Sequence, residues 1–153
     1  MIKKLLYAAL VLGSAVGLLA ADAFTGIWKL DLAKSTFASD RPVPKELTLT
    51  FTEQSTNRTQ TLKGIAADGS AISTAWTAPI TGGGAIFPAG QGPNGGASVK
   101  VIDNKTLVMT QNPRYGNAGA SRTYKLSADG KTITLTQTRE DGQDSAKMVF
   151  SRQ

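Results

Sequence analysis

The chain has 153 residues and a formal net charge of +6, and it contains neither His nor Cys. The missing residue types exclude Ser-His-Asp and Cys-His nucleophiles, thiol redox chemistry and His- or Cys-ligated zinc. The Lys and Arg residues are scattered without a cluster or stripe, so the charge does not predict nucleic-acid binding. The net positive charge does allow a weak attraction to an anionic envelope surface.

The N-terminus has the pattern of a secretory signal peptide. Two lysines precede an apolar run, Leu5–Ala20, and small residues follow up to Ala23. The run is shorter than the roughly 18 apolar residues expected of a membrane-spanning helix, so we expect cleavage near Ala23 rather than a retained anchor. The prediction is a signal peptide at 1–23 and a single domain at 24–153, in a periplasmic or secreted bacterial protein.

Alternation of apolar and polar residues dominates the rest of the chain. The stretch ELTLTFTEQ places Leu47, Leu49 and Phe51 on one face and threonines on the other, and KTITLTQTR repeats this pattern. A period of two is typical of antiparallel strands with one wet face, and four Asp-Gly or Asp-Asn pairs predict turns between them. We expect strands at Thr25–Asp31, Glu46–Glu53, Arg58–Ala66, Ala71–Ala78, Ala97–Ile102, Thr106–Gln111, Arg122–Ser127, Lys131–Arg139 and Ser145–Ser151, with a short extra one at Ala85–Phe87.

The number and order of these strands predict an all-β fold. Eight to ten strands in up-and-down order tend to close into an antiparallel β-barrel, because closure removes exposed strand edges; a β-sandwich is the alternative. Three segments break the strand pattern, at 33–44, 78–96 and 112–121. We expect the first to cross one end of the barrel and the glycine-rich second to gate the open end, since long loops in compact domains are often functional.

Aromatic and basic residues are the candidate binding residues. We expect Phe51, Trp76 and Phe87 to line the wall of an interior pocket, joined by Arg122 and Tyr124, which share one face of a strand. A buried arginine needs a partner for its charge, and in a pocket that partner can be an acidic ligand. The sequence leaves open which face Arg122 occupies, and it leaves open that the aromatic residues simply fill the core.

Carboxylates are the remaining candidates for catalysis. Four aspartates are explained by the predicted turns, and the acids left over show no spacing that makes a catalytic dyad. The Gly82–Gly84 run is not followed by the Lys-Ser/Thr and helix of a phosphate-binding loop. We therefore predict no catalytic residue, no cofactor and no metal, and a hydrolase that uses carboxylates alone is only a third interpretation.

Several segments resemble small exported bacterial proteins that are described as lipocalin-like or as uncharacterised. The most specific are GIWKLDLAKSTF and SADGKTITLT, and the resemblance covers nearly all of 24–153. It implies a lipocalin-like barrel. Lipocalins share a Gly-x-Trp on the first strand, which matches Gly26 and Trp28, and the resemblance implies that this Trp packs at the closed end against Arg152 or Arg139.

The predicted function is that of a monomeric, non-catalytic barrel that binds one small hydrophobic or amphipathic molecule inside. The alternative is a filled barrel whose outer surface contacts an envelope component or a protein partner. The two differ in interior volume, which only a three-dimensional structure provides.

Overall fold

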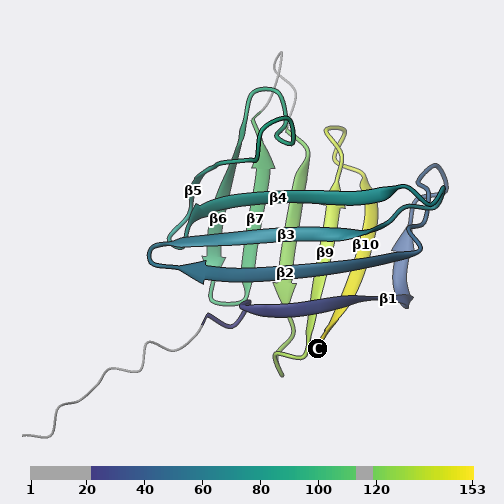
Figure 1. Cartoon of the computed structure of the whole chain (residues 1–153), viewed down its shortest axis with the longest axis horizontal. Helices are drawn as coiled ribbons and strands as arrows, with labels where there is room; N and C mark the ends of the chain where they lie inside the picture. Colours follow the sequence, from purple (N-terminus) through teal and green to yellow (C-terminus); the bar gives the residue numbers. More distant parts are fainter. Residues whose placement is uncertain (1–21, 113–118) are drawn as a thin grey trace, which may run out of the picture.

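The computed structural model describes residues 22–112 and 119–153, and in them ten antiparallel strands form one sheet (Figure 1). The order in the sheet is β4-β3-β2-β1-β10-β9-β8-β7-β6-β5. The strands are β1 (Gly26–Phe37), β2 (Glu46–Gln54), β3 (Asn57–Ile65), β4 (Ala71–Pro79), β5 (Gly83–Ala85), β6 (Ala97–Asp103), β7 (Thr106–Gln111), β8 (Ser121–Leu126), β9 (Thr132–Thr138) and β10 (Asp144–Arg152).

The two ends of this sheet meet, so the predicted up-and-down barrel is confirmed. Thr77 of β4 and Ile86, just after β5, exchange two backbone hydrogen bonds of 2.8 Å each. In Figure 1 strands β2–β4 cross in front of β6–β10, and the buried side chains lie between these two layers. Because one continuous sheet wraps around the core and its edge strands are bridged, the architecture is a nearly closed barrel and not the alternative β-sandwich.

The alternating pattern decides which side chains point inward. Leu47, Leu49 and Phe51 of β2 are buried, as are Ile133 and Leu135 of β9, while the threonines between them are partly exposed. β-Branched polar residues suit the outer face of such a sheet, because they are stiff at χ1 and their hydroxyl groups remain hydrated. The core is therefore the one expected from the period of two.

The predicted turns form with help from their own aspartates. The carboxylates of Asp68, Asp103, Asp129 and Asp141 each accept a hydrogen bond from the backbone N–H two residues later, at 2.7–3.1 Å. Such a side-chain bond replaces a backbone turn bond and stabilises a tight reversal. These four acids are structural.

Strand β1 is longer than predicted. The expected strand ended at Asp31, but β1 continues to Phe37 across a register shift between Asp31 and Thr36. Ser35 bridges the irregular stretch: its Oγ donates to the Asp31 carbonyl at 2.7 Å and accepts from the Val149 N–H at 2.9 Å. Because a side chain replaces the missing ladder bonds, the pairing survives residues that do not alternate.

Because consecutive strands run in opposite directions, the connections between strands alternate between the two ends of the barrel. Those that follow the even-numbered strands lie at the end that holds Gly26, and those that follow the odd-numbered strands lie at the other end. The predicted gate, Ala78–Gly96, is therefore divided: its first part turns at the Gly26 end and contains β5, and residues 86–96 lie at the opposite end. Among the described residues, no helix is long and apolar enough to cross a membrane.

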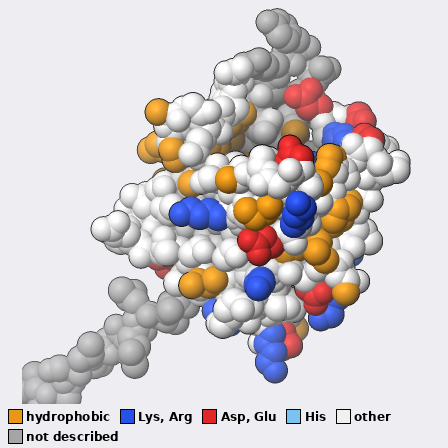
Figure 2. All heavy atoms as spheres, turned by 45° about the vertical axis from the view of Figure 1, so that its right-hand side comes forward, with side chains coloured by type: hydrophobic (Ala, Val, Ile, Leu, Met, Phe, Trp, Pro, Cys, Tyr) orange, Lys and Arg blue, Asp and Glu red, His pale blue; other side chains and the backbone are white. Residues whose placement is uncertain are grey.

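The predicted signal peptide lies almost wholly outside the described residues. Only Asp22 and Ala23 of the segment 1–23 are described. On the surface shown in Figure 2, Lys and Arg side chains are dispersed among acidic and uncharged ones. This matches the scattered basic residues in the sequence.

Candidate functional site

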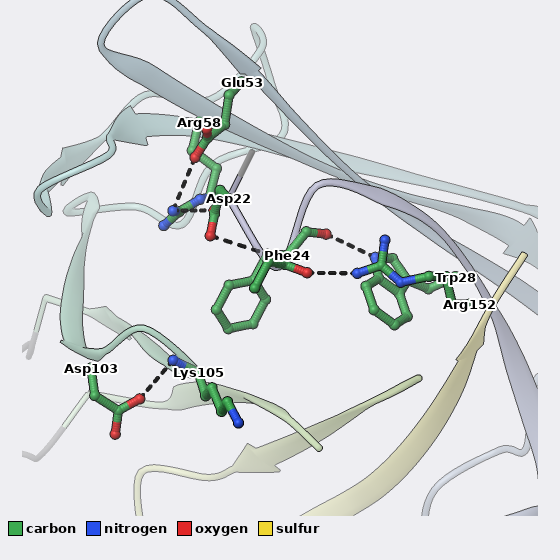
Figure 3. Close-up of polar contacts among 9 residues, drawn as sticks. Asp22, Phe24, Trp28, Glu53, Arg58, Asp103, Lys105 and Arg152 are labelled. Carbon is green, nitrogen blue, oxygen red and sulfur yellow. Dashed lines mark hydrogen bonds and ion pairs between the residues drawn. The ribbon is translucent and has the colours of Figure 1, made fainter. Parts of the chain in front are cut away.

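Trp28 closes one end of the barrel. Its side chain is fully buried, and its indole N–H donates to the Phe24 carbonyl at 2.9 Å. The guanidinium carbon of Arg152 lies 4.0 Å from the centre of the indole ring (Figure 3). This distance is well within the range of an attractive cation–π contact.

Arg152 ties the chain ends together over this tryptophan. Its guanidinium donates to the carbonyls of Thr25 at 2.9 Å, Ala23 at 2.6 Å and Gly130 at 3.1 Å. The residue that covers Trp28 is thus Arg152, whereas Arg139 binds Asp40 at 2.5 Å. The predicted plug residues therefore lie together at what we call the closed end.

The next layer of the interior is a cluster of aromatic rings. Phe51 lies 5.5 Å from Phe24, 6.2 Å from Trp76 and 5.5 Å from Tyr124, measured between ring centres. The Trp76 N–H reaches the Tyr124 hydroxyl at 3.5 Å, and that hydroxyl reaches the Gln60 side-chain oxygen at 3.4 Å. Burial raises the pKa of Tyr124. Tilted and edge-on pairs are arrangements that aromatic rings prefer, and all four rings are only 1% exposed, so this half of the barrel is packed.

Beyond the cluster, toward the opposite end, which we call the open end, the described residues line three cavities that border the interior and a further hollow at Pro93, Asn94, Gln111, Asn112 and Glu140. The apolar cavity has a volume of about 250 Å³ and is lined mostly by hydrophobic side chains, among them Phe37, Pro44, Leu47, Leu62, Ile72 and Met148. The arginine cavity, of about 200 Å³, is lined by Arg41, Arg122 and Arg139 with polar neighbours. The glycine-loop cavity, also about 200 Å³, lies under residues 87–93 and beside Trp76.

The five predicted wall residues divide between the cluster and the cavities. Trp76, Phe87 and Arg122 line the glycine-loop cavity. Phe51 and Tyr124 are buried in the aromatic cluster and line none of the three cavities. The aromatic residues thus play two parts, one in the packed core and one at the cavity wall.

Arg122 faces inward, and it alone lines all three cavities. Its place in β8, opposite Met109 and two residues before the buried Tyr124, puts it on the inner face. Among the described residues no carboxylate forms an ion pair with it. The structure thereby settles the orientation that the sequence left open.

Sequence reasoning missed Arg41. This residue lies in the segment 38–45 between β1 and β2, which crosses the open end and is called the crossing segment below. Arg41 lines both the apolar and the arginine cavity, and its guanidinium donates to the Ser145 hydroxyl at 3.2 Å. Burial, and then the charges of Arg122 and Arg139, lower the pKa of Arg41, although an arginine stays protonated at neutral pH. No periodic pattern covers the crossing segment, so nothing in the sequence showed that Arg41 turns inward.

A second residue that sequence reasoning missed is the buried Arg58, although the sequence contained its signal. Alternation along β3 places Arg58, Gln60 and Leu62 on the inner face. The Arg58 guanidinium pairs with Asp22 and, at 3.1 Å, with Glu53 (Figure 3). Burial, and then the hydrogen bond and charge of Asp22, raise the pKa of Glu53. This trio lies near the closed end, and in it the charge of Arg58 is balanced by carboxylates of the protein itself.

The structure offers no preformed metal site in the part of the chain that it describes. Within 22–112 and 119–153, no three side chains of the His, Cys, Asp and Glu types come together in a way that could hold an ion. The cavities are instead bounded by arginine, amide, hydroxyl and hydrocarbon groups.

No family model matches the chain, and neither a curated protein nor a solved structure matches it. The resemblance to lipocalin-like proteins therefore stays a prediction from the segments quoted above.

Proposed function

We propose that this protein is an exported, non-catalytic barrel that binds one small hydrophobic or amphipathic molecule at its open end. The observation that carries the proposal is the apolar cavity of about 250 Å³, which reaches the interior between β2, β3, β4 and the crossing segment. A ligand there would bury its hydrocarbon part and gain about 0.8 kcal/mol for each CH₂ group removed from water.

The shape of the interior supports a small ligand. Drug-sized ligands occupy pockets of about 300–1,000 Å³, so a cavity of 250 Å³ suits a short chain or a single ring system. The aromatic cluster fills the interior between the cavities and the closed end, where Trp28 with Arg152 closes the barrel. The ligand would thus enter from the open end.

The packed lower half also favours the competing proposal of a filled barrel that acts through its outer surface. In that case the open-end cavities would be incidental gaps between loops. The two proposals differ in whether a hydrocarbon probe occupies the apolar cavity.

The test uses octanol, which carries a hydrocarbon chain and no charge. Isothermal titration calorimetry should show one site per chain, and replacement of Ile72 by Trp should abolish binding because the larger side chain fills the cavity. The matched control is Ile102→Trp, at a residue on β6 that is 51% exposed and lines none of the three cavities. Octanol binding that survives Ile72→Trp, or absence of binding both of octanol and of its charged analogue octanoate, would reject the carrier in favour of the filled barrel.

Native mass spectrometry of protein purified from its own cells provides an independent readout. A retained lipid-like adduct, lost in the Ile72→Trp variant, would support the carrier. A bare mass in both proteins would count against it.

A further inference from the structure

The arginine and apolar cavities are lined by basic side chains and, among the described residues, by no acidic one. Arg41, Arg122 and Arg139 line the arginine cavity together, and Arg41 and Arg122 also line the apolar cavity. Asp40 is the acid that acts on Arg41, and its carboxylate binds Arg139. Among the described residues, Asp40 is the carboxylate in an ion pair with one of these three arginines, and no ion pair reaches Arg41 or Arg122.

This imbalance is unusual for the interior of this protein. The other inward-facing arginine, Arg58, has Asp22 and Glu53 as partners. Arg41 has a neutral hydroxyl partner, and neither Arg41 nor Arg122 forms an ion pair with any described residue. A partly buried cation loses hydration, and without an opposite charge this loss is not offset.

The two unpaired arginines lie where a ligand would enter. Both belong to the wall of the apolar cavity, whose remaining lining is mostly hydrocarbon. Gln137, buried on β9, lines both cavities with them and offers an amide group. The site is thus amphipathic: its apolar part lies against β2, β3 and β4, and its cationic, hydrogen-bonding part lies against β8, β9 and the crossing segment.

We propose that the ligand is an anionic amphiphile, whose acidic head group binds to the guanidinium groups of Arg41 and Arg122 while its short hydrocarbon tail occupies the apolar cavity. The inference rests on the proposed function and names the class of ligand for the same site. Arginine suits the role because its planar fork donates two parallel hydrogen bonds to a carboxylate or a phosphate. These two head groups share the chemistry that the site requires.

The test compares three probes that separate head group from tail: octanoate has both, octanol has only the tail, and acetate has only the charge. Calorimetry on the purified protein should show octanoate binding about tenfold or more tightly than octanol, because hydrogen bonds to charged groups are the strong ones. Acetate should bind far more weakly than octanoate, since it leaves the apolar cavity empty. Octyl phosphate in the same titration shows which head group the site prefers.

Arginine variants then identify the residues responsible. Arg41→Gln and Arg122→Gln should each reduce the octanoate affinity by about tenfold and leave the octanol affinity unchanged. Lys125→Gln, on the exposed outer face of the same strand as Arg122, is the matched control and should change neither. Arg41 lies outside the strands, so its variant should fold even if Arg122→Gln does not.

The outcomes distinguish this inference from the proposed function. If octanol and octanoate bind equally, or if the preference for octanoate survives both arginine variants, the anionic head group is rejected and the apolar carrier stands. If acetate binds as tightly as octanoate, the site is an anion site without a role for the tail, and the amphiphile is rejected. If neither octanol nor octanoate binds, the carrier itself fails, and the inference fails with it.

Discussion

Arg152 lies over the indole ring of Trp28, with its guanidinium carbon 4.0 Å from the ring centre, and joins the last strand to the first at the closed end. The same guanidinium binds three backbone carbonyls, two of them just before β1. The contact is therefore part of the closure of the barrel and lies apart from the cavities. This separation gives different expectations for changes at the two ends.

Replacement of Trp28 by Ala should destabilise the protein by about 3–5 kcal/mol, because the largest side chain of the closed end leaves a cavity. Urea unfolding measures this loss, and Ile27→Ala, at the exposed neighbour on the same strand, should change stability by less than about 0.5 kcal/mol. The octanol affinity of the folded Trp28→Ala variant should equal that of the parent protein. A variant that keeps its stability and loses affinity would instead make Trp28 a wall residue of the binding site.

Gly26 should not tolerate a side chain. Its φ is +145°, and a Cβ atom there would lie 2.8 Å from a terminal nitrogen of Arg152, which three hydrogen bonds hold in place. We expect Gly26→Ala to cost about 1–3 kcal/mol in unfolding free energy. Gly84→Ala is the control, because a Cβ at Gly84 would meet nothing within 4 Å. Equal stability of the two variants would contradict the role of Gly26 in this close approach.

The residues just before Phe24 should belong to the folded domain. Asp22 pairs with the buried Arg58, and the Ala23 carbonyl accepts a hydrogen bond of 2.6 Å from Arg152. Cleavage after Ala23, as the sequence suggests, would remove both contacts and leave a new ammonium group on Phe24, whose ring lies 5.7 Å from the Arg58 guanidinium. If the protein is exported as proposed, we therefore expect the mature chain to retain Asp22, with cleavage after Ala21.

Intact mass measurement of the exported protein decides where the chain begins. A chain that starts at Phe24 should be less stable than one that starts at Asp22, and Asp22→Asn should reproduce part of the loss, because removal of one partner of a buried ion pair is destabilising. Asp31→Asn, which removes an exposed ion pair with Lys34, is the control for the loss of a surface charge. Equal stability of the two chains would show that Asp22 and Ala23 are dispensable.

Glu53 should make stability fall as the pH rises above its ordinary pKa of 4.5. Its pKa is raised in the folded protein by burial and by Asp22, so the folded state holds this proton more strongly than the unfolded chain does. The stability linked to this proton is fully present below the ordinary pKa and is lost as the pH rises through the higher folded value.

The measurement is urea unfolding of the parent protein and of Glu53→Gln between about pH 4 and about pH 7. Asp31, Asp40, Asp68 and Asp129 act in the opposite direction, because hydrogen bonds lower their pKa values and their contribution is lost on acidification. The informative quantity is thus the difference in unfolding free energy between the parent protein and Glu53→Gln at each pH. The Glu53→Gln variant should lack the loss above pH 4.5 that the parent shows, and identical pH profiles would contradict the assignment.

The strands were predictable because alternation is a local property. Leu47, Leu49 and Phe51 point the same way in any extended chain, and the Asp-Gly turns follow from the backbone freedom of glycine. The end of β1 was not predictable, since its ladder with β10 is interrupted between Asp31 and Thr36, where the Ser35 hydroxyl binds β10 instead, and resumes at Thr36 and Phe37. Alternation in the sequence does not predict the end of a strand where a side chain takes the place of backbone ladder hydrogen bonds.

The sequence by itself determined an all-β fold with up-and-down strands and an interior with aromatic side chains, whereas the choice of a barrel over a β-sandwich came from the closed sheet. It also placed Trp28 on the first strand, where a tryptophan can close an end. Only the tertiary structure decided that Arg152 covers this ring, that Phe51 and Tyr124 belong to the packed cluster, and that Arg41 meets Arg122 beside an apolar cavity. Strand periodicity assigns each residue to a face, whereas cavities and charge pairs depend on how residues distant in the chain meet when the sheet closes.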